Sequence, residues 1–336
     1  MDKITNINYT IINQNNEQGS SRLEININGE QINYIILNTI RRAILTYIPI
    51  YAFSNFIFSL NESIYNNNYI KLRIKNLPIW GIENKIDTLE KKNIKADIIL
   101  DDENNINDDD NLDMSNSNID TINISSLNQL NMYVEYTNNT NTIYTVSTDD
   151  VKFYYGEKSI PSPYTIPIPI IKLHPNKRIN FTAITTVGNE KENSIYSAVC
   201  ACFYKEIDDH NYNLIVESRG QLTEKRIIEV ALINLINTIE NIAHIIPDKT
   251  DNIDTNKGEL IFIGENSTIG NLLSHGLQNH KKIKFAGYNS PHPLEEKVII
   301  HYELFEKTDN IKKICNDVII NYIELFNILL SLNNSI

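Results

Sequence analysis

Two cysteines, an acidic tract and a histidine between prolines are the residues of this sequence whose types and spacing could do chemistry. Cys200 and Cys202 alternate along an expected strand, so both thiols face one way, but structural zinc needs four ligands and no further pair lies nearby. The Asp-rich tract 101–110 lacks the central Gly and closing Glu of a calcium loop, which favours a solvated loop. His292 could be a ligand or a base, but a rigid turn explains it more simply.

Known catalytic patterns are absent from the sequence. It contains no phosphate-binding P-loop, no nucleophile elbow, no HExxH pair and no Asp cluster for two-metal nucleotidyl transfer. We therefore expect no catalytic residue, no bound metal and no cofactor. Three classes of function stay open at this point: an assembly or binding subunit, a stand-alone adaptor protein, and an enzyme of unknown chemistry.

Composition limits these classes further. The 336 residues include 42 acidic and 30 basic side chains, for a net charge of −12, and 41% are hydrophobic. The hydrophobic fraction supports a packed core, and the negative field repels phosphate, so any contact with DNA should be indirect, through a larger complex. Three cysteines indicate a reducing compartment. With no signal-peptide core and no apolar run near ~20 residues, we expect an intracellular protein without membrane contact.

The hydrophobic periodicity predicts an α+β fold. Alternation over 21–28 indicates a half-buried strand, and an i, i+3, i+4 stripe over 31–47 indicates a helix that Pro49 ends. The prolines in 160–175 favour an extended segment. Thr223 should cap a long helix over 223–245. Further strands are expected at 53–60, 130–136, 142–148, 178–187, 195–206 and 213–218.

The same order of elements occurs a second time after a polar linker at 247–258. A strand at 259–264, a helix at 267–280, strands at 285–289 and 297–305, and a closing helix at 309–332 repeat the start of the chain. Asn38–Arg42 then falls on Asn271–His275, and the first copy carries a long insertion between Phe58 and Asp209. Because neither thin sheet can close a core alone, we expect the two copies to pack together about a pseudo-twofold axis. The two short helices should pack on each other, and the two long helices should lie side by side. Coincidence in an Ile- and Asn-rich chain is the alternative.

A family resemblance rests on longer motifs. Residues 265–303 resemble the small alpha-like subunit of archaeal and eukaryotic RNA polymerases, called L in archaea, through a "T-x-G-N-L-L" helix start at Thr268 and an "F-A-G-Y-x-x-P-H-P" turn at Phe285. The N-terminal half resembles the larger alpha-like subunit, archaeal D or the eukaryotic third-largest subunit, through the "N-x-L-R-R"-like helix ending at Arg42. Joined in one chain, they resemble the arrangement in polymerases of large DNA viruses. The four-Cys cluster of many larger subunits is absent.

The resemblance implies a non-catalytic assembly platform that docks the second-largest and then the largest polymerase subunit, beside small zinc-binding subunits. The expected domains are a first dimerisation module (1–58 and 210–246), an inserted β-rich domain (59–209), the linker, and a second module (259–336). The protein would be located in the cytoplasm, in a virion or in the nucleus. The alternative is a stand-alone adaptor with the same fold.

Three groups of residues are expected to carry these roles. The partner-docking residues are Asn38, Arg41, Arg42, Ser194, Tyr196 and Ser197. The dimerisation and core residues of the second module are Gly270, Asn271, Leu272, Leu273, Phe285, Gly287, Tyr288, His292 and Pro293. The residues that pack the long helices are Ile228, Leu235, Ile239, Val318, Tyr322 and Phe326.

Overall fold

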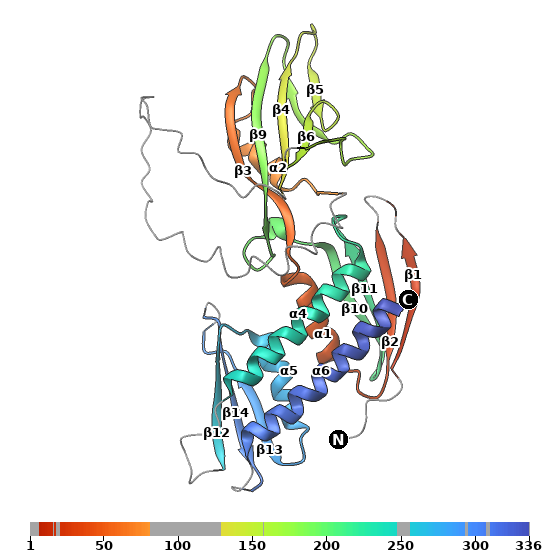
Figure 1. Cartoon of the computed structure of the whole chain (residues 1–336), viewed down its shortest axis with the longest axis vertical. Coiled ribbons are helices and arrows are strands. Elements are labelled where there is room, and N and C mark those ends of the chain that lie inside the picture. Colours follow the sequence, from red (N-terminus) through yellow and green to blue (C-terminus); the bar gives the residue numbers. More distant parts are fainter. Residues whose placement is uncertain are drawn as a thin grey trace. The chain divides into compact units, whose positions relative to one another are not determined.

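The chain divides into two compact units, described separately here from a computed structural model (Figure 1). The structure describes residues 7–15, 17, 21–80, 129–156, 158–246, 256–292, 295–306 and 310–335. The first unit joins Met1–Pro49 to Gly188–Ile336, and the second is Ile50–Val187. The acidic tract and Pro293 lie outside the described residues.

The first half of the first unit is an antiparallel sheet with two helices, called here the first module. Its strands run in the order β1-β2-β11-β10. Leu23, Ile25 and Ile27 of β2 point into the core, as their alternation predicted. The elements are β1 (Asn8–Asn15), β2 (Arg22–Asn28), α1 (Tyr34–Thr46), β10 (Val199–Asp208), β11 (Asn211–Ser218) and α4 (Glu224–Ile245). The largely polar β1 was not predicted from the sequence.

The second half, called here the second module, has the same topology without the extra edge strand. Its strand order is β12-β14-β13, so β12, β14 and β13 correspond to β2, β11 and β10. Asn33 and Asn266 cap α1 and α5 in the same way, each side chain accepting from a backbone N–H two residues on. The internal repeat is therefore confirmed. The elements are β12 (Lys257–Ile263), α5 (Ser267–Gln278), β13 (Ile283–Asn289), β14 (Lys297–Leu304) and α6 (Ile311–Ser335).

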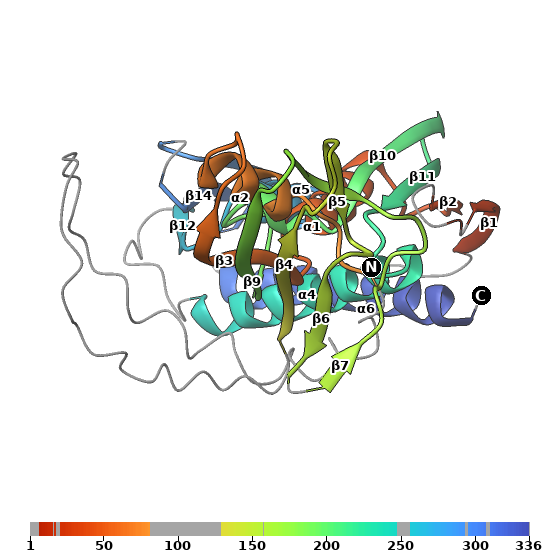
Figure 2. The same cartoon turned by 90° about the horizontal axis from the view of Figure 1, so that it is seen from above.

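The described α-helices of the first unit, α1, α4, α5 and α6, join the two modules. α4 lies along α6, and α1 packs against α5 (Figures 1 and 2). This confirms the expected pairing of the two short helices with each other and of the two long helices with each other. All six residues predicted to pack the long helices are buried: Ile228, Leu235, Ile239, Val318, Tyr322 and Phe326.

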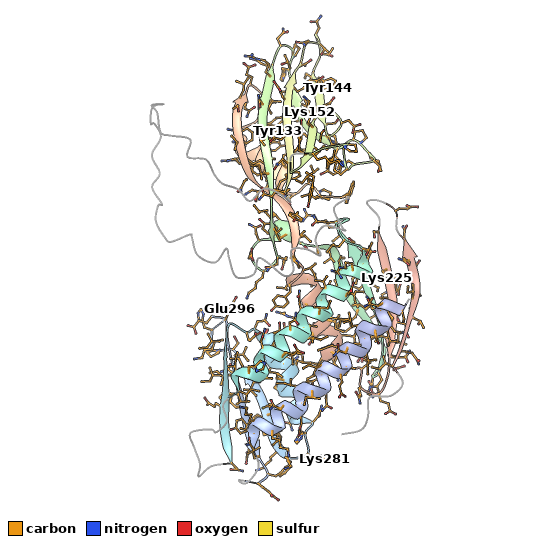
Figure 3. All side chains as sticks on the ribbon, viewed as in Figure 1. Tyr133, Tyr144, Lys152, Lys225, Lys281 and Glu296 are labelled. Carbon is orange, nitrogen blue, oxygen red and sulfur yellow. The ribbon has the colours of Figure 1, made fainter. Side chains whose placement is uncertain are left out.

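The second unit is β-rich. It contains a five-stranded sheet in the order β3-β9-β4-β6-β7 and a two-stranded sheet of β5 and β8. Tyr133 of β4 lies opposite Lys152 of β6 (Figure 3). Its elements are β3 (Ile50–Asn61), α2 (Asn67–Lys75), β4 (Leu130–Thr137), β5 (Tyr144–Ser147), β6 (Lys152–Tyr155), β7 (Lys158–Ile160), β8 (Pro169–Leu173) and β9 (Arg178–Gly188). Neither α2 nor β6 was predicted.

The boundaries of the compact units differ from the expected insertion at 59–209. β3 belongs wholly to the second unit, which begins at Ile50. β10, which the prediction assigned to the insertion, pairs with β11 and so completes the first module's sheet. Hydrogen bonding to a neighbouring strand, which the sequence of β10 does not reveal, decides its unit.

The sequence contains no apolar run near ~20 residues, and the structure adds one helix to be considered as a membrane span. By length and hydropathy alone, α6 is long and apolar enough to cross a bilayer, and it is the only one of the described helices that is. The same test is passed by core helices of soluble proteins. Here α6 buries one face, which includes Ile314, Val318 and Leu329, inside the first unit.

Replacing Gly276 by Ala is expected to destabilise the first unit, although Ala favours helix by about 1 kcal/mol over Gly. A Cβ at this position would lie 2.4 Å from Cγ1 of Val318 and 2.7 Å from Cε2 of Tyr322. We expect a net loss because overpacking costs about 1–3 kcal/mol. Thermal unfolding followed by far-UV circular dichroism measures it, with exposed Ser331→Ala on α6 as the control. An unchanged or raised midpoint for Gly276→Ala would show that α5 and α6 separate easily.

Candidate docking surface and module junction

The outer face of α1 presents Arg41 beside Asn38. The Asn38 Oδ1 accepts from Nε and Nη2 of Arg41 at 3.1 and 2.8 Å, which holds the guanidinium against its own helix. α1 packs on β10, and Arg41 lies near enough to Cys202 to lower the pKa of its thiol. Burial outweighs this effect and raises that pKa to about 12, so the thiol stays protonated at neutral pH.

The segment before β10 continues this surface. The backbone N–H of Lys191 donates to the Thr46 carbonyl at 3.4 Å, which joins the segment to the end of α1. Ser194 is exposed and Ser197 is half-buried, whereas Tyr196 is only 9% exposed and packs its ring over Gly188. Tyr196 therefore offers a partner little surface and instead fixes the turn.

Arg219 supports this turn from the chain after β11. Its Nη1 donates to the Ile195 carbonyl at 3.1 Å, and its backbone N–H donates to the Ala198 carbonyl at 2.9 Å. Burial lowers the pKa of its guanidinium, although Arg remains charged at neutral pH. No local pattern around Arg219 distinguishes it in the sequence, since its role depends on a turn that precedes it by some twenty residues.

Arg42 has a different position from the one expected of a docking residue. Its Nε donates to the Oγ1 of Thr268 on α5, so it lies in the junction between the two modules. The Tyr47 hydroxyl contacts the Asn266 side chain at the same junction. The paired arginines therefore separate: Arg41 belongs to the outer face of α1, and Arg42 joins the modules.

The predicted core residues of the second module divide into two groups. Gly270, Leu272 and Leu273 are buried on α5, and Asn271 is half-buried. The Tyr288 side chain is 39% exposed, so it is not a core residue as predicted, although its ring lies against Gly270, where a Cβ would come within 3.0 Å of it.

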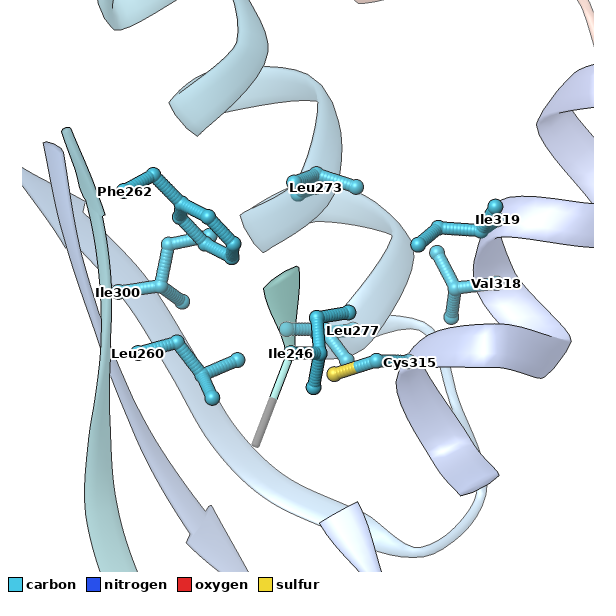
Figure 4. A pocket seen from close by; sticks show the side chains of 9 residues that line it. All are labelled: Ile246, Leu260, Phe262, Leu273, Leu277, Ile300, Cys315, Val318 and Ile319. Atoms are coloured by element: carbon cyan, nitrogen blue, oxygen red, sulfur yellow. The ribbon is translucent and has the colours of Figure 1, made fainter. Parts of the chain in front are cut away.

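The prediction for Phe285 is wrong, because its side chain is 52% exposed. A bulge between Ile283 and Phe285 shifts the register of β13, so Ile283 and Ala286 point inward instead. Gly287 is half-buried and His292 is exposed. The core of this module is apolar and encloses a small cavity (Figure 4) lined by Ile246, Leu260, Phe262, Leu273, Leu277, Ile300, Cys315, Val318 and Ile319.

The described residues contain no group of three or more His, Cys, Asp or Glu side chains placed to hold a metal ion. Cys200 is exposed, while Cys202 and Cys315 are buried. Burial raises the pKa of the Cys315 thiol to about 12, which disfavours the thiolate that metals bind.

His275 is expected to make the stability of the first unit sensitive to acid. Its Nε2 lies 3.0 Å from Nδ2 of Asn279 and its Nδ1 lies 3.3 Å from the Tyr322 hydroxyl, a pairing that suits a neutral ring. Burial lowers the pKa of His275 below its unfolded value of about 6.5. The unfolded chain therefore takes up this proton first, and stability is lost as pH falls from about 6.5 towards the folded pKa.

Urea midpoints at about pH 7.5 and about pH 5.5 test this dependence. The difference should shrink in His275→Gln and persist in His244→Gln, which alters an exposed histidine at the end of α4. Equal pH dependence in the wild type and His275→Gln would contradict the assignment.

Comparisons with known proteins agree with this geometry. The RNA polymerase Rpb3/Rpb11 dimerisation domain family matches residues 257–329, which is the second module from β12 into α6. A protein of Acanthamoeba polyphaga mimivirus, named as a DNA-directed RNA polymerase subunit, is 26% identical over 321 residues, covering 90% of this chain and 88% of its own.

Shorter matches involve cellular polymerases. A Caenorhabditis elegans subunit of RNA polymerases I and III is 37% identical over 59 residues, which are 18% of this chain and 41% of that protein. The Rpo11 subunit of the Saccharolobus solfataricus RNA polymerase is 40% identical over 47 residues, 14% of this chain and 51% of its own.

The chain contains a repeated strand–helix–strand–long-helix module whose two copies pair through their helices, and the second copy matches the Rpb3/Rpb11 dimerisation domain. Because the mimivirus relative aligns with both modules and the second unit, the likeness extends across nearly the whole chain. The chain is an alpha-like subunit of a DNA-directed RNA polymerase, and it takes part in the assembly of that enzyme. Other polymerase subunits are its partners, and a stand-alone adaptor is not favoured.

Proposed function

We propose that this chain is a non-catalytic assembly platform in which two alpha-like modules, separate proteins in most organisms, form one intramolecular dimer. The observation that carries the proposal is the shared topology of the two modules and their pairing through α1 with α5 and α4 with α6 inside one chain. Joining the modules makes their association intramolecular, with an effective concentration that can reach the millimolar range.

The second-largest polymerase subunit docks on the surface formed by Asn38, Arg41 and the turn at 194–197, and the largest subunit follows. Arg41 supports this role because a planar guanidinium on an outer helix face can bind a carboxylate through two hydrogen bonds. Small zinc-binding subunits complete the complex, and DNA is contacted only through other subunits. The platform acts inside the cell, in the virion or in both, as a virus-type polymerase would.

Recovery of the tagged full-length chain from expressing cells tests the proposal. Mass spectrometry of the associated proteins should identify the two largest polymerase subunits, and the recovered complex should synthesise RNA while the purified chain alone should not. Recovery of the chain free of large subunits, under conditions in which the polymerase stays intact, would contradict the proposal.

A further inference from the structure

The junction between α1 and α5 is charged on one side. The Arg42 Nε donates to Thr268 Oγ1, and the Lys191 Nζ lies 2.9 Å from Glu296 Oε1. The two modules contribute groups of opposite charge. The first module supplies Arg42, Tyr47 and Lys191, and the second module supplies Glu265, Asn266, Thr268 and Glu296.

The carboxylate of Glu265 makes this junction more than a surface ion pair. Burial raises its pKa, while the nearby ammonium of Lys191 acts in the opposite direction and favours the charged form. Glu296 and Lys191 are the exposed members of the same group (Glu296 is marked in Figure 3). Lys191 of the first module thus interacts with both carboxylates of the second, while Arg42 donates to the Thr268 hydroxyl beside them.

The internal repeat shows what each module would meet in a pair of like modules. With the caps Asn33 and Asn266 aligned, Glu265 corresponds to Ile32 and Thr268 corresponds to Ile35. Both isoleucines are buried. A first module paired with another first module would therefore place Arg42 against Ile35 in place of Thr268. Lys191 would meet His210 in place of Glu296, since the backbone N–H groups of Gly29 and Gly264 donate to the His210 and Glu296 carbonyls in the same way.

A pair of two second modules is disfavoured for a related reason. In the second module, His275 stands at the position of Arg42, and His280 stands at the position of Tyr47. Two second modules would place Glu265 near His275 and His280 and without Lys191, which belongs to the first module. Glu265 is partly desolvated, so a pair of second modules that removes Lys191 from it is disfavoured. A pair of first modules loses the acceptors of Arg42 and Lys191 and so gains less from the junction than the mixed pair does.

We propose that Arg42 and Lys191, with Glu265 and Glu296, are the residues that make the first module pair with the second module and reject a second copy of itself. This inference rests on the proposed intramolecular dimer. The covalent link raises the local concentration of the correct partner, but it does not by itself forbid two chains from pairing first module with first and second with second. The charge arrangement supplies that selectivity.

Charge reversal in the full-length purified chain tests the proposal without other polymerase subunits. The variant R42E/K191E places four carboxylates at the junction, and E265K/E296K places four cations there. Each should either self-associate at concentrations about tenfold lower than the wild type, by light scattering after size-exclusion chromatography, or unfold at lower urea. The variant that combines all four changes restores opposite charges and should recover the wild-type mass and midpoint.

The matched control is K205E/K281E, which reverses two exposed lysines of the same unit away from the junction (Lys281 is marked in Figure 3). It should behave as the wild type. The proposal is overturned if R42E/K191E behaves like this control, or if the fourfold variant is no closer to the wild type than R42E/K191E. Neither result depends on docking of a large subunit, so a failure here is distinguishable from a failure of the platform function.

Discussion

Replacing Arg41 by Glu is expected to reduce recovery of the large polymerase subunits with this chain by a factor of roughly 30 to 4,000. The estimate corresponds to the cost of about 2–5 kcal/mol for removing one partner of a hydrogen-bonded interfacial charge pair. Arg41 is half-buried beside Asn38 on the outer face of α1, opposite the apolar stripe that packs the helix. Folding should survive, because the substitution leaves every buried residue of α1 in place.

Quantitative pull-down from cells that express the tagged variant measures the effect. Arg41→Lys should have an intermediate effect, because an ammonium keeps the charge but lacks the planar fork that binds a carboxylate through two bonds. Lys281→Glu, an exposed reversal elsewhere in the same unit, is the matched control. Wild-type yield of large subunits with Arg41→Glu would remove α1 from the docking surface. Arg42 is unsuitable for this test, because its change also disturbs the module junction.

Replacing Phe326 by Ala is expected to destabilise the first unit by about 3–5 kcal/mol. The Phe326 side chain is fully buried on α6, and the centroid of its ring lies 6.4 Å from that of Tyr322. Loss of the Phe326 ring would leave a cavity where the long helices of the two modules pack together. Because natural domains have a total stability of only about 5–15 kcal/mol, a single truncation here removes a large part of it.

Two spectroscopic probes separate the units in this experiment. The helices α1, α4, α5 and α6 belong to the first unit and dominate far-UV circular dichroism, whereas Trp80, the sole tryptophan, belongs to the second. The circular dichroism midpoint should fall by about 1–3 M urea in Phe326→Ala. Ile320→Ala, at a position 52% exposed on the same helix, should change it by little. Equal midpoints for the two variants would contradict the central role of this contact.

Local periodicity in the sequence was enough to predict most elements of both units. Alternating residues in β2 and the apolar stripes of α1, α4 and α6 each encode which face is buried, because burial of that face is what stabilises the element. Among the elements that were missed, β1 and α2 are largely polar and β6 is only four residues long. Such segments form through pairing or packing with neighbours, which a local pattern does not contain.

The sequence by itself also determined the repeat, the class of protein and the absence of known catalytic motifs, since these depend on residue types and their spacing. Only the tertiary structure decided where individual side chains lie. A bulge turned Phe285 outward, sheet pairing assigned β10 to the first module, and packing of α1 on α5 directed Arg42 into the junction while Arg41 stayed on the outer face. The physical reason is the same in each case: contacts between residues distant in the chain fix register and orientation, and neighbouring residues in the sequence do not encode them.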